Sequence, residues 1–381
     1  MKALFFIFHG FDPSNGISKK IHYQVKALKQ CGLDIELCFY DVAADGRRCW
    51  KVDDRVIVDL GTGLVAKLKR RIDYSPIVQY VKENKIEFVY IRSDHNANPF
   101  TISMVKSMKR GGAKVVMEIP TYPYDQEYVN RKMKIELAVD RLFRYSLAKK
   151  LDGIVTFSNA SRIFGKDTIR ISNGIDFDAI PLKEHQNDTS KELHLIGVAE
   201  IHYWHGYDRL IKGFAEYYRT NPDYKVYFHL LGIFAGEMER GACITIVKEN
   251  HLEPYVVYHG AKHGEELDGL FERCDFAIGS LGRHRSGITY IKTLKNREYA
   301  ARGFSFIYSE TDEDFDSKPY VLKAPADESP IDINQIINFY CSLKISPKDI
   351  RASIQGLSWH TQMHTVFVEL FKDEKNRIKI L

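Results

Sequence analysis

The sequence has few of the features that mark membrane-spanning or metal-binding proteins. No segment approaches the roughly 18 uninterrupted apolar residues that a membrane helix needs. Only 6 of the 381 residues are cysteine, without a CxxC pair or a histidine at ligand spacing, so neither a zinc site nor a disulfide framework is indicated. Scattered cysteines favour a reducing cytoplasm. We therefore expect a cytoplasmic protein that holds no metal.

The first residues also lack the pattern of a secretory signal. MKALFFIFHGFD contains one lysine and a short apolar run that His9 and Asp12 interrupt, and no small-residue cleavage site follows. This segment predicts a buried first strand.

Acidic residues are under-represented in the first half of the chain. Residues 1–180 contain 30 Lys and Arg against 21 Asp and Glu. The excess lies mainly in 66–72, 105–114 and 128–150, where Leu, Phe and Ile are interleaved with basic residues. Such faces suit peripheral contact with the inner, anionic face of a membrane, but an ordinary solvated helix face explains them equally well. No nucleic-acid-binding motif accompanies them, so nucleic acid is not expected as a partner.

Short apolar or β-branched runs alternate with helix-length segments, which predicts βαβ units and parallel sheets. A polar segment with a proline, 181–192, interrupts the pattern and is typical of a linker. We therefore predict an α/β protein with two Rossmann-like doubly wound domains, 1–180 and 193–360, and a C-terminal helical segment, 361–381. Ligands bind outside the carboxyl ends of strands in such sheets, so a cleft between the domains is expected. The predicted strands are 3–8, 35–40, 88–92, 114–119, 153–158, 193–199, 225–232, 255–260, 275–281 and 304–309.

Two loops after predicted strands have the composition of an anion site. The first is rich in Gly, Pro, Asn and Ser and opens a helix near Gly16, although many α/β proteins use such a turn only to reverse the chain. The second, 282–292, contains Arg283, His284, Arg285 and Lys292 among two glycines.

A helix follows the second loop. Thr293 is its predicted N-cap, whose hydroxyl would accept a hydrogen bond from a first-turn amide. The free amides of 294–296, the helix dipole and Lys295 would then face the cleft, and a diphosphate is the anion we expect there.

Several segments, in this order, resemble a known family: SNGIDFDAI (172–180), VAEIHYWHGYDRLIKGF (198–214), VVYHGAKHGEELDGLFERCDFAIGSL (256–281) and LKNREYAARGFSF (294–306). They are similar to the second domain of retaining GT-B glycosyltransferases of glycosyltransferase family 4. EIPTYPYDQEY (118–128) resembles a segment of capsule and surface-polysaccharide members. The resemblance covers most of the chain and implies a GT-B fold whose C-terminal helix returns toward the first domain. It also implies that Glu298 accepts hydrogen bonds from the ribose hydroxyls of a nucleotide.

The chain departs from the family pattern at three positions. Tyr290 stands where members usually carry a glutamate near the transferred hexose, in a loop about six residues longer. Glu200 and His205 stand where members carry an arginine and a lysine that bind the diphosphate. A site without these cations binds pyrophosphate poorly unless other donors replace them. The candidate replacements are Arg283, Arg285 and Lys295.

The resemblance implies retaining transfer, in which stabilisation of the leaving diphosphate and exclusion of water are the main tasks. Positive side chains and helix amides can do this without a metal ion or a cofactor. We expect Arg285, Lys295 and His205 to act in catalysis. The expected nucleotide-sugar-binding residues are Glu298, Thr293, Leu294, Arg283, Gly16 and Tyr290.

Candidate acceptor residues lie in the first half. Asp94, His95 and Asn96 follow a predicted strand, where their side chains would form hydrogen bonds with sugar hydroxyls; a structural role is the commoner one for such a histidine. Glu118, Tyr122 and Tyr124 form a candidate acidic and aromatic rim, with core packing an equal account of the tyrosines.

The resemblance therefore implies a hexosyltransferase-like enzyme of surface polysaccharide or glycan synthesis. It would transfer sugar from a nucleotide sugar to a glycan or a polyprenyl-linked saccharide. Two alternatives stay open: a non-catalytic GT-B subunit that binds a partner or glycan, and a sugar-nucleotide epimerase on the same fold.

Overall fold

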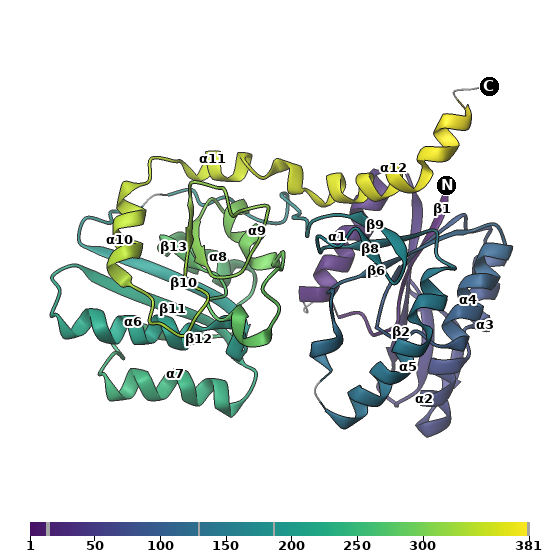
Figure 1. Ribbon diagram of the computed structural model, residues 1–381, viewed down its shortest axis with the longest axis horizontal. Coiled ribbons are helices and arrows are strands. Elements are labelled where there is room, and N and C mark those ends of the chain that lie inside the picture. Colours follow the sequence, from purple (N-terminus) through teal and green to yellow (C-terminus); the bar gives the residue numbers. More distant parts are fainter. Residues whose placement is uncertain (13–15, 129, 186, 379–381) are drawn as a thin grey trace. The chain divides into compact units, whose positions relative to one another are not determined.

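The computed structural model describes residues 1–12, 16–128, 130–185 and 187–378. The chain forms two compact units (Figure 1): unit 1 contains Met1–Ser172 and Trp359–Leu381, and unit 2 contains Asn173–Ser358. The sequence pattern places the first boundary at 180, but the start of the expected linker packs on unit 2. The backbone amide of Lys183 donates to the carbonyl of Arg302 (2.9 Å), and its ammonium donates to the carbonyl of Glu272 (2.9 Å).

Unit 1 is built on a nine-stranded sheet with the order β4-β3-β2-β1-β5-β6-β7-β9-β8. Its central pairs are parallel, and β3, β4 and β8 pair antiparallel at the two edges. The strands are β1 (Lys2–Ile7), β2 (Asp34–Val42), β3 (Arg48–Val52), β4 (Arg55–Gly61), β5 (Phe88–Arg92), β6 (Lys114–Ile119), β7 (Gly153–Thr156), β8 (Arg162–Ile163) and β9 (Lys166–Arg170).

Helices cover both faces of this sheet, because alternate residues of its buried strands point to opposite sides. Leu4 and Phe6 face the core under α2–α5, whereas Phe5 and Ile7 face the core under α1 and α12. The C-terminal helix α12 thus returns to unit 1. The helices are α1 (Gly16–Gln30), α2 (Gly63–Ile72), α3 (Ser75–Glu83), α4 (Pro99–Arg110), η1 (Asp125–Glu127), α5 (Arg131–Ala148) and α12 (Trp359–Ile378).

Unit 2 contains a six-stranded, fully parallel sheet with the order β12-β11-β10-β13-β14-β15. Its two faces form separate cores, one with α6, α7 and α10 and the other with α8, α9 and α11. The strands are β10 (Glu192–Ile201), β11 (Lys225–Phe234), β12 (Val256–Gly260), β13 (Phe276–Ile278), β14 (Ser305–Tyr308) and β15 (Val321–Lys323). The helices are η2 (Tyr203–His205), α6 (Tyr207–Arg219), α7 (Glu237–Glu249), α8 (Gly264–Arg273), η3 (Arg283–Ser286), α9 (Leu294–Ala301), α10 (Ile333–Ser342), α11 (Pro347–Ala352) and η4 (Gln355–Leu357).

A ladder of three histidines crosses β10, β11 and β12. His194 Nδ1 lies 2.9 Å from His229 Nε2, and His229 Nδ1 lies 2.9 Å from His259 Nε2. Burial, and then the neighbouring His194 and His259, lower the pKa of His229 to about 4. His229 is therefore neutral near pH 7, and in each contact one ring nitrogen donates a hydrogen bond that the other accepts.

The predicted class, two doubly wound α/β domains, is confirmed. All ten predicted strands are present, with ends that differ by a few residues. The sequence pattern missed β3, β4, β8, β9 and β15.

Candidate functional site

Three loops meet at the carboxyl edge of the unit 2 sheet. Because β10, β13 and β14 are parallel neighbours, the segments that follow them lie at one edge. The amide of Leu281 donates to the carbonyl of His205 (2.8 Å), and the amide of Ser309 donates to the carbonyl of Ser280 (2.9 Å). These bonds hold the β10, β13 and β14 loops together beside the N-terminus of α9.

The N-terminus of α9 lacks a side-chain cap. Thr293 occupies the N-cap position, as predicted, but its buried hydroxyl makes no hydrogen bond within the described residues. The expected bond from this hydroxyl to a first-turn amide is therefore wrong. Without that bond, the amides of residues 294–296 keep their donors for another acceptor.

Lys295, in the first turn of α9, has a buried ammonium. Its Nζ has no hydrogen-bond partner among the described residues and lies 5.7 Å from the centre of the Tyr207 ring. Burial, and then the charge of Arg283, lower its pKa, while Glu310 opposes that shift. A buried ammonium without a partner is costly, and an anion at the helix N-terminus would relieve the cost.

Glu310 follows β14 and is the buried acid of this cluster. It is 1% exposed, and neither carboxylate oxygen has a hydrogen-bond partner in the described part of the chain. Burial raises its pKa, against the lowering effect of Arg283 and Lys295. The guanidinium of Arg283 lies 5.5 Å from the Trp204 ring. The cluster thus combines two cations with one carboxylate that protonates readily.

His205 supplies a neutral donor to the same place. Its Nδ1 accepts a hydrogen bond from the amide of His202 (3.0 Å), so the ring proton is on Nε2. Burial, and then the charges of Lys295 and Arg283, lower its pKa well below the ordinary value. The Nε2–H group can therefore donate to an anion while the ring carries no charge.

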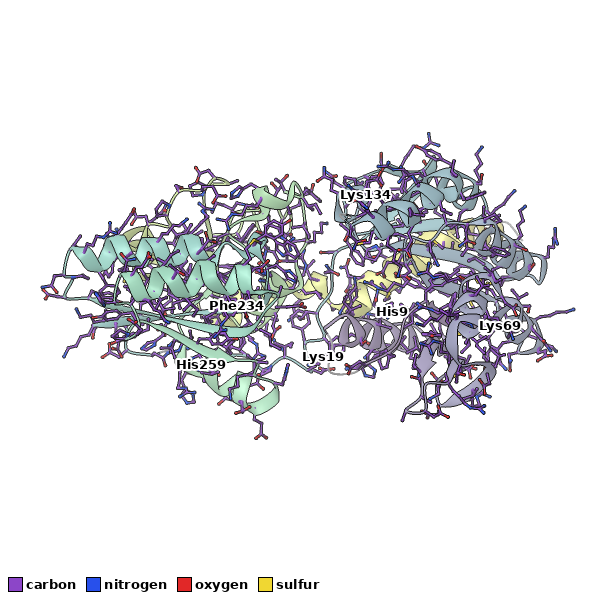
Figure 2. All side chains as sticks on the ribbon, turned by 90° about the horizontal axis from the view of Figure 1, so that it is seen from below. His9, Lys19, Lys69, Lys134, Phe234 and His259 are labelled. Carbon is purple, nitrogen blue, oxygen red and sulfur yellow. The ribbon has the colours of Figure 1, made fainter. Side chains whose placement is uncertain are left out.

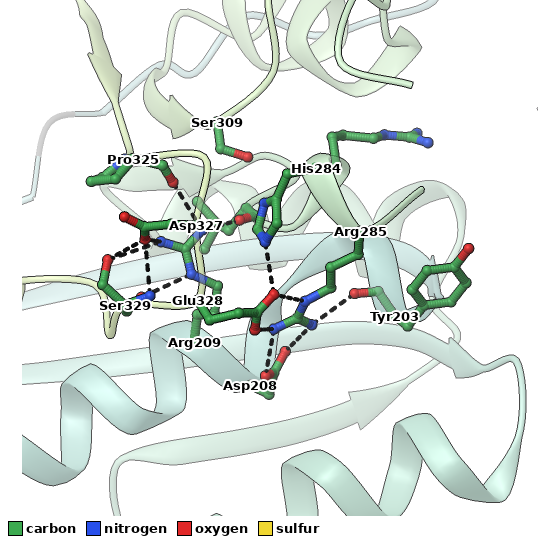
Figure 3. Close-up of polar contacts among 12 residues, drawn as sticks. Tyr203, Asp208, Arg209, His284, Arg285, Ser309, Pro325, Asp327, Glu328 and Ser329 are labelled. Carbon is green, nitrogen blue, oxygen red and sulfur yellow. Dashed lines mark hydrogen bonds and ion pairs between the residues drawn. The ribbon is translucent and has the colours of Figure 1, made fainter. Parts of the chain in front are cut away.

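Arg285 was expected to face the diphosphate, but all three of its guanidinium nitrogens are already engaged (Figure 3). Nη1 and Nη2 donate to the two carboxylate oxygens of Asp208 at 2.7 and 2.9 Å, and Nε donates to Glu328 at 2.8 Å. Nη1 also donates to the carbonyl of Tyr203 (2.9 Å). Arg285 therefore ties the 282–292 loop to α6, and this geometry gives no support for a direct catalytic role.

Glu298 lies about one helical turn after Lys295 in α9. Its Oε1 accepts from Arg302 Nε at 3.0 Å, and Arg302 also pairs with Asp268 at 2.7 Å. The Glu298 side chain is 33% exposed, which leaves its second oxygen available to a ligand. Leu294 is exposed in the first turn, and Tyr290 forms an isolated bridge with Thr311.

The predicted acceptor residues of unit 1 do not form one rim. Glu118 is fully buried, where it accepts from Gln24 (2.6 Å) and Tyr90 (2.7 Å) and pairs with Lys20 (3.4 Å) and Arg92. Burial alone would raise its pKa, but these partners lower it to about 2. Glu118 is therefore an internal anchor for β5, β6 and α1 rather than a rim residue.

Asp94 and His95 do come together, in a unit 1 pocket of about 270 Å³. His95 stacks on Tyr124 (3.8 Å between ring centres), and burial lowers its pKa to about 4. Burial raises the pKa of Asp94, against the charge of Arg70. Tyr124 supports His95 and donates to Asp140 (2.6 Å), while Tyr122 packs on Phe164. Asn96 also lines this pocket. Sequence reasoning missed these pocket residues: Phe8, Arg70, Arg71, Tyr74, Ala97, Asn98, Tyr128, Ile135, Glu136 and Val139.

Gly16 is the first residue of α1; the loop residues directly before it lie outside the described part of the chain. Among the described residues, no cluster of three or more His, Cys, Asp or Glu side chains is arranged to hold a metal ion. No helix there combines the length and the apolar character needed to cross a bilayer.

Solved structures define the class to which this architecture belongs. Sucrose-phosphate synthase of Thermosynechococcus elongatus matches with a TM-score of 0.67 at 13% identity, over 98% of this chain and 100% of that chain. A glycosyltransferase of Rickettsia africae ESF-5 matches with a TM-score of 0.63 at 13% identity, over 98% of this chain and 99% of that chain. Anabaena HepE in complex with UDP matches with a TM-score of 0.62 at 13% identity, over 98% of this chain and 100% of that chain. The chain therefore has the GT-B fold of these glycosyltransferases. No protein-family model and no curated protein matches the sequence.

Proposed function

We propose that this protein is a glycosyltransferase that takes its sugar from a nucleoside-diphosphate sugar. The observation that carries the proposal is the N-terminus of α9, where uncapped first-turn amides stand beside a buried Lys295 ammonium without a partner. Backbone amides and a cation at a helix N-terminus are the usual elements of a phosphate site. The structural match to HepE in complex with UDP supports a UDP-sugar as the donor.

Each side chain of the cluster has a proposed role toward the donor. Lys295, Arg283 and the Nε2–H of His205 bind the diphosphate, together with the amides that follow Thr293. The free oxygen of Glu298 accepts from the ribose hydroxyls, with Leu294 beside it. Tyr290 and Gly16 stay candidates for contacts with the transferred sugar and the diphosphate.

The proposed reaction is transfer with retention, without a metal ion. The leaving diphosphate gains negative charge as its bond to the sugar breaks, and fixed donors stabilise that charge. One such donor contributes on the order of 3 kcal/mol to the barrier, or about a hundredfold in rate. Lys295 and His205 are the residues we propose for this task in place of Arg285.

The proposed acceptor is a glycan or a polyprenyl-linked saccharide of surface polysaccharide synthesis, met at the inner face of a membrane. The unit 1 pocket supports an acceptor role, because Asp94 and neutral His95 lie together in it and suit sugar hydroxyls.

Thermal stabilisation by nucleotide sugars tests the proposal. A ligand that binds only the folded state raises the melting temperature with its concentration and affinity. UDP-, GDP-, ADP- and CMP-sugars are compared with the parent protein and Lys295→Met. We expect one nucleotide series to stabilise the parent and to lose most of that effect in the variant. No stabilisation by any series would refute nucleotide-sugar binding.

A non-catalytic GT-B subunit is the second candidate. The observation that favours it is Glu200, whose carboxylate is 74% exposed and pairs with His202 (3.5 Å), where the resembled family carries a cation. Nucleotide binding without transfer or hydrolysis of any nucleotide sugar would support this candidate.

A further inference from the structure

Helix α2 turns its apolar stripe away from the core of unit 1. Leu64, Val65 and Leu68 are 81%, 65% and 57% exposed, and Ala66 is the only residue of the helix that is buried. At about 100° per residue, these three side chains and Ile72 lie on one side, opposite Ala66. A surface helix normally buries such an apolar stripe against the rest of the protein. The stripe of α2 is instead exposed.

Helix α5 adds a second exposed stripe beside the first. Ile135, Val139 and Leu142 are 68%, 40% and 74% exposed and follow the i, i+4, i+7 spacing of one helix face. The two helices are joined by Arg71 Nη2, which donates to Glu136 Oε1 at 2.9 Å. Exposed apolar residues on this scale mark an interaction surface. We call these two stripes and their flanking lysines the α2–α5 surface.

The exposed charges of the α2–α5 surface are basic. Lys67, Lys69, Lys132 and Lys134 flank the stripes, and Figure 2 marks Lys69 and Lys134 on unit 1.

The acidic side chains of these helices are paired or buried. Helix α2 contains no acidic residue. In α5, Glu136 pairs with Arg71, and the buried Asp140 accepts from Tyr124 (2.6 Å) and from the amide of Ala97 (3.0 Å). The α2–α5 surface therefore combines aliphatic side chains with positive charge.

Exposed aliphatic side chains together with lysines favour one kind of binding partner. A second copy of the chain in a symmetric dimer would place lysines against lysines. Proteins bind nucleic acid through basic, polar and aromatic side chains, so the exposed leucines would have no partner in such a complex. An anionic bilayer satisfies both features, since lipid phosphates pair with lysines while aliphatic side chains enter the acyl boundary.

We propose that the α2–α5 surface docks unit 1 onto the anionic face of a lipid bilayer. The pocket that contains Asp94 shares its walls with this surface, because Arg70 and Arg71 of α2 and Ile135 and Val139 of α5 line it. Docking therefore places the pocket beside lipid headgroups. Only the identity of the pocket's occupant, a lipid-borne acceptor, rests on the proposed function.

Vesicle flotation without nucleotide tests the docking alone. Vesicles of phosphatidylcholine with 30% phosphatidylglycerol are compared with pure phosphatidylcholine at low and high salt. The variants are Leu64→Ser/Leu68→Ser and Lys67→Glu/Lys69→Glu. Their matched controls change exposed residues of unit 2: Ile233→Ser/Met238→Ser, which are 62% and 71% exposed in the parent, and Lys344→Glu/Lys348→Glu. Circular dichroism verifies that every variant is folded.

We expect the parent to float with anionic vesicles and to detach as salt rises, because screening weakens the lysine contacts. The leucine pair should lower binding roughly tenfold or more per residue, and the lysine pair should abolish it, while both controls bind like the parent. Failure of the parent to bind anionic vesicles would overturn the proposal. So would a leucine pair that binds like its control, or a parent dimer that this pair dissociates without any vesicle binding. A nucleotide-binding parent that ignores vesicles would leave the proposed function intact and refute the docking.

Discussion

Replacement of Lys295 by methionine should separate stability from function in one substitution. The ammonium of Lys295 is buried without a hydrogen-bond partner among the described residues, and burial lowers its pKa. Methionine has a similar length and no charge to desolvate. Replacing a buried charge by an apolar side chain of similar volume is often neutral or stabilising by about 1–4 kcal/mol. We therefore expect Lys295→Met to melt at the parent temperature or a few degrees above it.

The same substitution should weaken the binding of a nucleoside diphosphate strongly. A hydrogen bond to a charged group is worth about 1.5–3 kcal/mol, so its loss corresponds to a factor of roughly 10 to 150 in Kd. Calorimetric titration with UDP measures this factor, and the melting temperature is recorded on the same preparations.

Arg285→Met is the matched control, because Arg285 belongs to the adjacent loop but is engaged with Asp208 and Glu328. Its loss leaves the half-buried Asp208 with Lys212, 3.5 Å away, as its remaining cationic partner, which we expect to cost about 2–3 kcal/mol after solvent screening and to lower Tm by about 5–10 °C. Binding of UDP should change little. The reverse pattern, with Lys295→Met unstable and Arg285→Met unable to bind UDP, would refute the assignment of the two cations.

Three further outcomes are expected. Glu298→Gln should keep the fold and weaken nucleotide binding about tenfold, since an amide replaces a carboxylate acceptor; equal Kd values for UDP would place Glu298 outside the site. Glu310→Gln should reduce the proton uptake that accompanies UDP binding, measured by calorimetry in buffers of different ionisation enthalpy. Burial favours the protonated form of Glu310, and an incoming diphosphate favours it further; unchanged uptake would exclude this role. The pKa of His229 is lower in the folded chain than in the unfolded one, so its contribution to stability is present above the ordinary value and is lost as pH falls from about 6.5 to about 4. Denaturant melts of the parent should show that the free energy of unfolding falls by on the order of 1–2 kcal/mol over this pH range, after solvent screening. The His229→Gln variant should not show this fall; equal pH profiles of parent and variant would contradict this role of His229.

The buried strands could be predicted because their apolar runs are short and helices separate them, as in FVYIR before α4. The missed hairpin of β3 and β4 had a local signal as well: two β-prone runs flank Asp53 and Asp54, and Asp53 has a φ of 49° in the tight turn. The short edge strands β8 and β15 offer no such pattern, since two or three residues contain no period.

The candidate site could be predicted only in part. The position of Lys295 and the N-cap position of Thr293 follow from local sequence and are as expected, whereas the expected cap hydrogen bond to the Thr293 hydroxyl is absent among the described residues. The engagement of Arg285 could not be read from sequence, because its partners Asp208 and Glu328 lie 77 and 43 positions away. The burial of Glu118 depends likewise on Gln24, 94 positions distant. Long-range partners of charged side chains come from the packing of the elements, which periodicity does not encode.

The most direct test of the nucleotide-sugar site is a crystal structure of the protein with UDP. We predict that the diphosphate lies at the N-terminus of α9, within hydrogen-bond distance of the Lys295 ammonium and the first-turn amides. We also predict that the ribose hydroxyls donate hydrogen bonds to the carboxylate of Glu298. UDP bound at another place, or a diphosphate that contacts Arg285 after its bonds to Asp208 have broken, would refute the assignment of this site.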